Sequence, residues 1–146
     1  MIKGNNSLVI RDLKMVADDR GLLDQLFNDD LPFQVKRIYV VYPRKGIVRG
    51  LHGHKRESKA FWVFLGSAKF AVAPMQSTGQ QMKTFTLDYR KPQLLIVPHN
   101  HYNGFVALED NTGVLCLSSL SLEESERDDY RVDPYKFGDP WKVESR

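Results

Sequence analysis

Apolar residues in this chain fall into short runs separated by turn-forming residues. Residues 35–42 are rich in β-branched and aromatic side chains and end at Pro43, and the run 94–97 likewise ends at a proline. Residues 83–87 alternate polar and apolar side chains with the period of two that is typical of a half-buried strand. Further strands are predicted at 61–65, 68–73, 105–108 and 114–117. Short strands at this spacing predict an all-β sandwich or small barrel.

Helical patterns are rare. Residues 22–27 have some apolar residues at helical spacing, but the run is short. Near the C-terminus, Ser121 precedes Leu122, Glu123 and Glu124, and we expect one helical turn there, because serine is a good N-cap and early acids suit the helix dipole. From residue 128 onward, prolines and aromatic residues predict an irregular strap whose aromatic side chains pack against the barrel.

Composition and charge fit a soluble globular protein. The chain has 146 residues, 42% of them hydrophobic and 27% charged, which predicts one domain over residues 1–146. No apolar run reaches the roughly 18 to 20 residues of a membrane helix, and residues 1–6 contain no apolar signal core. The single cysteine, Cys116, cannot form an internal disulfide, so we expect a reduced, cytoplasmic protein with an inert buried thiol. The net charge of only +3 and the scattered basic residues argue against a nucleic-acid partner.

The residues that point to chemistry are concentrated in Gly46–Lys55. Residues two apart in a strand face the same side, so His52 and His54 are predicted to point into one space. Gly50 and Gly53 remove side chains beside them, which would let a ligand approach the backbone. The nearby basic side chains suit an anionic ligand, and imidazoles titrate near neutral pH, where proton transfer is most effective. The segment therefore predicts a cavity that binds an anion and moves a proton.

A His-x-His pair on a small barrel also suggests a metal. The segment resembles the cupin pattern Gly, five residues, His-x-His, four residues, Glu, six residues, Gly, with Lys59 at the position of the carboxylate ligand. In the second cupin pattern, Pro-x-Gly-x-x-His, Asn103 stands at the ligand position. A protonated lysine offers no lone pair and repels a divalent ion, so we expect neither a metal nor another cofactor. The residues alone do not exclude a metal site, because Glu57, His99 or His101 could replace the missing ligands.

Three motifs resemble the sugar-nucleotide 3,4-ketoisomerases, which are cupins with a double-stranded β-helix (jelly-roll) fold. They are Asp19-Arg20-Gly21-x-Leu, Pro32-Phe33-x-Val35-Lys36-Arg37-Ile38-Tyr39 and Gly46-x-x-Arg49-Gly50-x-His52-x-His54-Lys55. The resemblance covers residues 18–66, and residues 129–135 resemble the C-terminal pattern of the same family. It implies isomerisation of dTDP-4-keto-6-deoxy-glucose on the route to 3-amino sugars of bacterial surface polysaccharides such as lipopolysaccharide. It also implies a homodimer that exchanges N-terminal strands, here residues 7–13.

The related dTDP-4-keto-6-deoxy-hexose 3,5-epimerases share other motifs with this chain. The run from Arg49 to His52 matches their Arg-Gly-Leu-His, and the segment after Val97 is similar to their Pro-x-x-x-x-His-Gly-Phe, with Asn in place of His. Residues 118–121 are Ser-Ser-Leu-Ser where the epimerases carry a Tyr-Tyr pair, and His54 stands where they carry Gln. The resemblance therefore favours the ketoisomerase over the 3-epimerase or 3,5-epimerase, and a non-catalytic sugar-nucleotide-binding cupin is the third alternative.

The resemblance implies roles for individual residues. His52 and His54 are the candidates for the proton steps, and Tyr39 is the candidate donor to a sugar oxygen. The candidates for binding the diphosphate or the sugar are Arg20, Arg37, Arg49, Lys55, Lys59, His101, Tyr102 and Asn103.

Overall fold

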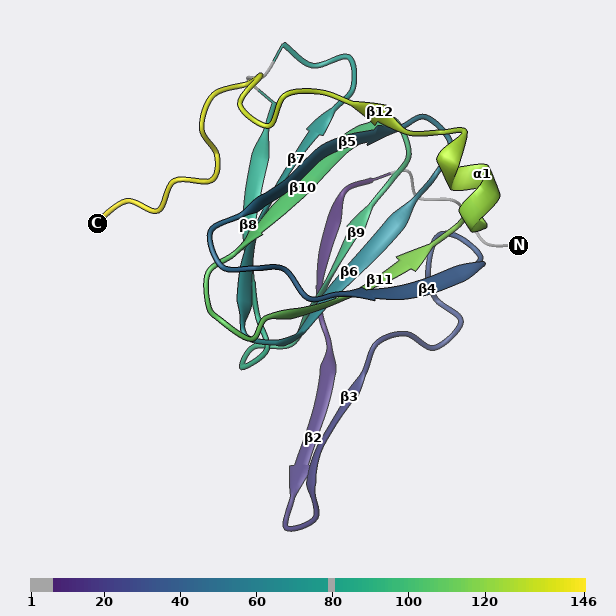
Figure 1. Ribbon diagram of the computed structural model, residues 1–146. Helices are drawn as coiled ribbons and strands as arrows, with labels where there is room; N and C mark the ends of the chain where they lie inside the picture. The colour runs from purple at the N-terminus through teal and green to yellow at the C-terminus, as the bar shows by residue number, and fades with distance from the viewer. Residues whose placement is uncertain (1–6, 79–80) are drawn as a thin grey trace.

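Two five-stranded antiparallel sheets make up most of the molecule, a computed structural model that describes residues 7–78 and 81–146 (Figure 1). In spatial order, the first sheet contains β1 (Val9–Asp12), β9 (Gln93–Val97), β6 (Lys59–Leu65), β11 (Gly113–Ser118) and β4 (Arg37–Val41). The second contains β12 (Tyr130–Arg131), β5 (Val48–His54), β10 (His101–Ala107), β7 (Ser67–Pro74) and β8 (Lys83–Asp88). The arrangement confirms the all-β fold that the short, turn-bounded strands predict, and it is the jelly roll that the resemblance to cupins implies.

The remaining elements lie outside the two sheets. β2 (Lys14–Asp18) and β3 (Gly21–Gln25) form a hairpin that projects away from them, at the bottom of Figure 1. The short helical pattern at 22–27 therefore corresponds to a strand. α1 (Leu122–Glu126) is the expected helical turn, and its N-cap Ser121 forms a capping box with Glu124. Among the described residues, no helix is long and apolar enough to cross a membrane.

The alternation of side chains in the strands creates one apolar layer between the sheets and one on each outer face. Phe61, Phe70 and Phe105 meet in the inner layer, with ring centroids 5.0 to 6.2 Å apart. The outer face of the first sheet is covered by residues of the N-terminal segment, such as Leu31. The outer face of the second sheet is covered by the C-terminal strap, in which Trp141 is buried. The expected packing of the strap aromatics is thus confirmed for this tryptophan.

A β-bulge in β5 decides which of its side chains face the interior. His52 lies opposite Asn103, whereas Arg49 lies opposite Phe105, so three steps along β5 match two steps along β10. Such an extra residue breaks the simple alternation of a strand. As a result, Arg49 and His52 both line the interior although they are an odd number of residues apart.

The glycines beside the histidines are explained by strand packing. At the bulge, a Cβ on Gly50 would lie 2.7 Å from the Cα of Gly104. A Cβ on Gly53 would lie 2.6 Å from the ring of Tyr102. The prediction that Gly50 and Gly53 make room for a ligand is therefore wrong, because the neighbouring strand and its side chains occupy that space.

The N-terminal segment that was expected to exchange between two chains pairs within its own chain. β1 pairs with β9 from Val9 opposite Ile96 to Asp12 opposite Gln93. The hairpin β2–β3, rather than residues 7–13, is the element that leaves the body of the molecule (Figure 1).

Candidate active site

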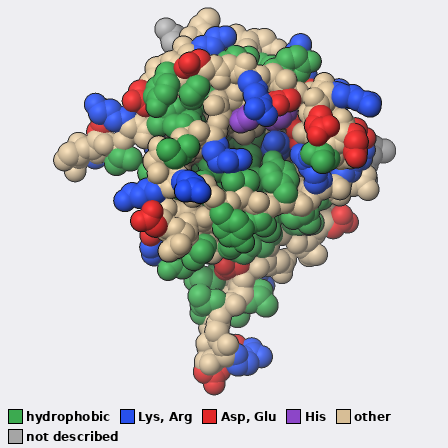
Figure 2. All heavy atoms as spheres, viewed as in Figure 1, with side chains coloured by type: hydrophobic (Ala, Val, Ile, Leu, Met, Phe, Trp, Pro, Cys, Tyr) green, Lys and Arg blue, Asp and Glu red, His purple; other side chains and the backbone are tan. Residues whose placement is uncertain are grey.

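A cavity of about 130 Å³ opens between the two sheets at one end of the inner apolar layer. Both sheets contribute to its wall, which joins apolar side chains to one imidazole, two cationic groups and a phenol. Figure 2 shows histidine in a hollow of this face, with Lys and Arg side chains nearby. The residues that line the cavity are Tyr39, Val41, Arg49, His52, Lys59, Phe61, Asn103, Phe105 and Cys116.

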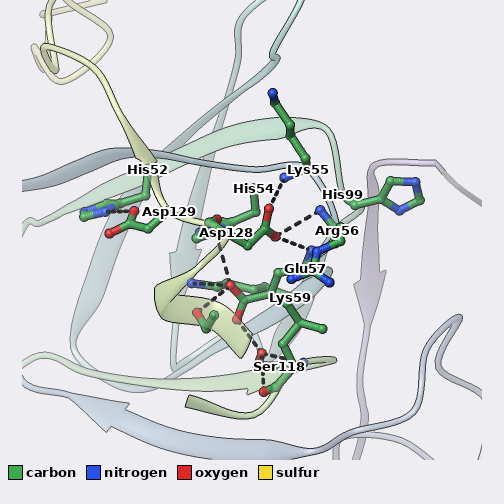
Figure 3. A network of polar contacts seen from close by, with 12 residues as sticks. His52, His54, Lys55, Arg56, Glu57, Lys59, His99, Ser118, Asp128 and Asp129 are labelled. Atoms are coloured by element: carbon green, nitrogen blue, oxygen red, sulfur yellow. Dashed lines mark hydrogen bonds and ion pairs between the residues drawn. The ribbon is translucent and has the colours of Figure 1, made fainter. Parts of the chain in front are cut away.

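His52 is paired with a carboxylate from the C-terminal strap. Its Nδ1 lies 3.6 Å from Oδ1 of Asp129, and Figure 3 shows the two side chains next to each other. β12 positions the carboxylate, because it pairs with β5 and brings Arg131 opposite His52. The guanidinium of Arg131 in turn donates to Oδ2 of Asp129 at 2.9 Å. With Nδ1 directed at Asp129, Nε2 is the nitrogen left for a ligand.

Two opposing effects act on the pKa of His52. Burial of the imidazole lowers its pKa, and the positive charges of Arg131 and Lys59 lower it further, whereas Asp129 raises it. The net direction is downward, so the neutral, proton-accepting form predominates at neutral pH. For Asp129, partial burial favours the acid form, but the hydrogen bond and charge of Arg131 outweigh it and lower the pKa of the carboxyl group.

Lys59 and Tyr39 form a donor pair on the opposite part of the wall. Lys59 Nζ donates to the Tyr39 hydroxyl at 3.1 Å. Burial lowers the pKa of the lysine, and burial raises the pKa of the tyrosine, which therefore stays protonated. The thiol of Cys116 contacts the same hydroxyl, and its burial raises its own pKa to about 11. Cys116 is buried as expected, but it lies on the cavity wall.

Behind the donor pair, a buried carboxylate joins several polar groups. Glu57 is 1% exposed and accepts hydrogen bonds from the hydroxyls of Ser118 and Ser125. Arg37 Nη2 donates to Glu57 Oε1 at 3.2 Å, and Lys59 Nζ lies 3.9 Å from Oε2. We call this set the Glu57 network (Figure 3).

His54 lies in the Glu57 network and not on the cavity wall. Its Nδ1 is 2.7 Å from the carbonyl oxygen of Asp128 and 3.1 Å from Glu57 Oε2. Two acceptors at Nδ1 require a proton there, so neutral His54 has its lone pair on Nε2, which is buried without a partner among the described residues. Burial lowers the pKa of His54, and Lys59 lowers it further. The two histidines share one side of β5, but only His52 reaches the cavity.

The side chain of Asp128 holds the loop between β5 and β6. Its carboxylate accepts backbone N–H bonds from Lys55, Arg56 and Glu57 at 2.8 to 2.9 Å. Three such bonds satisfy donors that would otherwise be left without partners at the end of a strand. This carboxylate therefore places Glu57 and the residues that follow it.

One group of side chains in the described part of the chain offers the spacing of a metal site. Single ligand atoms of His54, Glu57 and Asp128 lie within 4.8 Å of one another. However, the Asp128 carboxylate is bound to three backbone N–H groups, and Glu57 is bound to two hydroxyls and a guanidinium. The ammonium of Lys59 lies beside them. Protein donors thus use carboxylate lone pairs that a metal would need, and the Lys59 ammonium repels a cation from this position.

The profile of one protein family, described as "FdtA: WxcM-like, C-terminal", matches residues 6–140. This chain belongs to that family. Over 87 residues it is 30% identical to the TDP-4-oxo-6-deoxy-alpha-D-glucose-3,4-oxoisomerase of Aneurinibacillus thermoaerophilus, a match that covers 58% of this chain and 60% of that enzyme. The Arg-Gly-Leu-His-Gly-His-Lys segment and its neighbouring motifs indicated the sugar-nucleotide 3,4-ketoisomerases, and the similarity to a 3,4-oxoisomerase confirms that resemblance.

Solved structures agree on the fold. QdtA, a sugar 3,4-ketoisomerase from Thermoanaerobacterium thermosaccharolyticum solved with TDP, superposes with a TM-score of 0.70 at 24% identity, covering 94% of both chains. ChmJ, a 3'-monoepimerase from Streptomyces bikiniensis solved with dTDP-quinovose, superposes with a TM-score of 0.80 at 18% identity, covering 92% of this chain and 72% of that one. These similarities confirm the cupin fold of this WxcM-like chain.

The structure separates the predicted site residues into three groups. Tyr39, Arg49, His52, Lys59 and Asn103 line the cavity. Arg37 and His54 lie behind the wall, in contact with Glu57. The others lie elsewhere, namely Arg20, Lys55, His101 and Tyr102.

For this last group the structure gives specific placements. Tyr102 faces the outer side of β10, where it packs on Phe137 of the strap and does not line the cavity, so its role in substrate binding stays a prediction. His101 Nδ1 bonds the backbone oxygen of His99 at 2.9 Å and stays outside the cavity lining. Lys55 Nζ lies 4.5 Å above the ring of Tyr130, at the surface.

Arg20 lies at the tip of the projecting hairpin. Its guanidinium pairs with the carboxylate of Asp18, and its side chain is 86% exposed. It does not line the cavity of its own chain.

Sequence reasoning missed Asp129 and the role of Glu57. Asp129 lies in a segment that resembles the family's C-terminal pattern, and this was the signal that it might have a function. Nothing in strand periodicity links it to His52, because the contact depends on the pairing of β12 with β5. Glu57 drew attention as a substitute metal ligand, whereas the structure uses it as a partner of Arg37 and Lys59.

Proposed function

We propose that this protein is a sugar-nucleotide 3,4-ketoisomerase that acts on dTDP-4-keto-6-deoxy-glucose. The observation that carries the proposal is one cavity in which the His52–Asp129 pair faces the Lys59–Tyr39 donor pair. Membership of the WxcM-like family and the similarity to a 3,4-oxoisomerase support this reaction. The oxoisomerase match covers 60% of that enzyme, so the assignment rests on the cavity as much as on the relative.

His52 is the base of the proposed reaction. Its neutral Nε2 removes the proton from C3, which is acidic because C3 adjoins the C4 ketone. The electron pair of the C3–H bond forms the C3=C4 double bond, and the carbonyl electrons move to O4. The imidazolium that results is stabilised by Asp129, 3.6 Å from Nδ1. A base with a pKa near neutrality suits this step.

The Lys59–Tyr39 pair stabilises the charge that develops on O4. A preorganised cation and hydroxyl in a partly dry cavity stabilise an oxyanion more than bulk water does. The O3 proton then moves to O4 through this donor pair, and the electron pair left on O3 forms the C3 carbonyl. The C3=C4 electrons take up a proton at C4 from the His52 imidazolium, after that imidazolium has exchanged its proton with solvent. Atoms and charges balance, and the ketone has moved from C4 to C3 with no net change in composition.

The remaining cavity residues bind the substrate in this proposal. Arg49 and Asn103 offer donors to sugar and phosphate oxygens from the second sheet. Arg37 acts indirectly, since Glu57 and Tyr39 hold its guanidinium. The physiological context that we propose is cytoplasmic deoxy- and amino-sugar synthesis for surface polysaccharide.

The runner-up is a 3- or 3,5-epimerase, because a structure similar to this one belongs to a 3'-monoepimerase. An epimerase needs an acid that returns a proton to the opposite face of the ring. Ser118, in the stretch where the resemblance would place the epimerase tyrosine pair, is fully buried and bonded to Glu57. This placement favours the ketoisomerase.

The experiment that tests the proposal is an NMR time course with dTDP-4-keto-6-deoxy-glucose in D2O. We expect a 3-keto product with solvent deuterium at C4. His52→Asn should abolish the reaction while dTDP still binds. His99→Asn is the matched control, because His99 is outside the cavity lining, and this variant should react like the wild type.

Other outcomes of this time course contradict the proposal. Inversion at C3 or C5 with the ketone still at C4 would identify an epimerase. Binding of dTDP without any change of the sugar would identify a non-catalytic cupin. Full activity of His52→Asn would remove the proposed base.

We also propose that the protein forms a homodimer through the hairpin β2–β3. Both hairpin strands are exposed, including Leu22 at 74% and Leu23 at 60%. A two-stranded hairpin is marginally stable in water on its own, so covering these side chains with a second copy is favourable. Such a dimer would also carry Arg20 toward another chain, which is the arrangement in which Arg20 could bind a substrate.

A further inference from the structure

We propose that Glu57 is a positioning residue of the active site, which keeps the ammonium of Lys59 charged at the cavity wall and holds Arg37 against Tyr39. Glu57 does not line the cavity, so it acts through these two cations. The proposal deepens the proposed function. It rests on that function only in one respect, which is that the charge of Lys59 stabilises an oxyanion of the substrate.

The hydrogen bonds of Glu57 fix its carboxylate in one place. Its side chain is 0% exposed. Oε1 accepts from Ser118 and Arg37, and Oε2 accepts from Ser125 at 2.8 Å. His54 Nδ1 adds a contact at 3.1 Å. A buried carboxylate is costly unless donors surround it, and here donors come from β4, β5, β11 and α1.

The network extends from Glu57 to the cavity by two routes. Along the first, Arg37 stacks over the Tyr39 ring, with its central carbon 4.9 Å from the ring centroid. Along the second, Lys59 Nζ lies 3.9 Å from Glu57 and 3.1 Å from the Tyr39 hydroxyl. Both routes end on the same tyrosine, so one buried charge orients both members of the donor pair.

Charged and titratable groups face Lys59 from every element around it. They are Glu57 from the loop before β6, Arg37 and Tyr39 from β4, His52, His54 and Arg49 from β5, Cys116 from β11 and Asp129 beside β12. Burial lowers the pKa of Lys59, and among the charges Glu57 has the largest effect and raises it. Arg37 has the opposite effect on the lysine.

The test is a direct titration of Lys59 in the free protein. Lysine labelled with ¹³C at Cε is followed by NMR against pH, and Lys59→Met assigns the signal. In Glu57→Gln the midpoint of Lys59 should fall by about 1 to 3 pH units, the usual effect of losing an opposite charge at this range. Glu57→Asp, which keeps the charge, should recover most of the shift.

Glu109→Gln is the matched control. Like Glu57, Glu109 accepts hydrogen bonds from a serine hydroxyl (Ser67) and an arginine guanidinium (Arg90), but it does not line the cavity. This variant should leave the titration of Lys59 unchanged. An unchanged midpoint in Glu57→Gln would overturn the proposal.

Arg37→Gln is a second test, in which the midpoint of Lys59 should shift in the opposite direction. It does not require that the Glu57→Gln variant folds. With one cation removed from Glu57, the midpoint of Lys59 should rise, and a fall or no change would contradict the network. In turnover assays, the alkaline limb of kcat should move to lower pH in Glu57→Gln, because Lys59 loses its proton earlier. The NMR titration needs no substrate, so a failure of the ketoisomerase assignment would be seen separately.

Discussion

Replacing Asp129 by Asn tests the partner of the proposed base without changing the shape of its side chain. The carboxylate lies 3.6 Å from Nδ1 of His52. At an effective dielectric constant of 20, two unit charges at that distance attract by about 5 kcal/mol, which is a ceiling. The side chains of His52 and Asp129 are 33% and 28% exposed, so water screens most of this attraction. A value of about 1 kcal/mol, the upper end for exposed ion pairs, is the realistic size of the effect.

This magnitude sets the direction and size of two changes in Asp129→Asn. Asp129 raises the pKa of His52, so its removal lowers that pKa, by somewhat less than about one unit. The acid limb of kcat/KM, where His52 becomes protonated, should therefore move to lower pH. The plateau rate should fall about fivefold, because about 1 kcal/mol of imidazolium stabilisation is lost from the transition state.

Two measurements check these changes. The rate of deuterium entry at C4 gives the pH profile of turnover, and the Cε1–H signal of His52 gives its titration in the free protein. Asp133→Asn is the control, because Asp133 lies on the same strap, is exposed, and its carboxylate accepts a hydrogen bond from the backbone N–H of Tyr135. An acid limb that stays in place or moves to higher pH would refute the pairing of His52 with Asp129.

Three further predictions concern other parts of the site. Lys59→Met should lower kcat by about 10²- to 10³-fold, as expected for the loss of one oxyanion donor, while dTDP affinity measured by calorimetry stays within a factor of a few; a small loss of kcat would contradict its role. Asp128→Ala should lower the free energy of unfolding in urea by about 3 to 6 kcal/mol, because three N–H groups of residues 55–57 lose a charged acceptor; a loss below about 1 kcal/mol would contradict the anchor. Co-expressed Arg20→Ala and His52→Asn chains, each inactive alone, should recover about a quarter of the wild-type activity if Arg20 serves the site of a partner in a C2 dimer; no recovery would contradict that arrangement.

The strands and the face of the histidines could be predicted because both depend on local patterns. Alternating side chains and prolines mark the strands that the structure contains, and the capping box of α1 is visible in the sequence around Ser121. The separation of two places His52 and His54 on one side of β5, and this is correct. The separation does not tell which of the two histidines reaches the cavity. His54 stays behind the cavity wall because its ring contacts the backbone oxygen of Asp128 and the carboxylate of Glu57.

Other features depend on contacts between distant segments and could not be read from periodicity. The bulge at Gly50 places Arg49 beside His52 on the wall, although their odd spacing would put them on opposite sides. Tyr102 faces the strap because β10 alternates, and the strap reaches it only in the folded chain. Asp129 joins His52 through the pairing of β12, a strand of two residues with no pattern of its own.

In the proposed reaction, the side chain of Lys59 stabilises the enolate from a position that carries a metal ligand in the cupin pattern. In the cupin pattern this position would carry a carboxylate that faces an ion. Here the lysine brings its positive charge to the cavity itself, 3.1 Å from a phenol, and the carboxylate of Glu57 lies on the far side of that charge. An enolate oxygen needs a cation or a strong donor close to it and no anion in contact. Because Glu57 is buried behind Lys59 and does not line the cavity, it supports the ammonium without facing the substrate. In the proposed reaction, this order of the two charges, with the cation inside and the anion behind, suits the site to moving a proton next to a ketone.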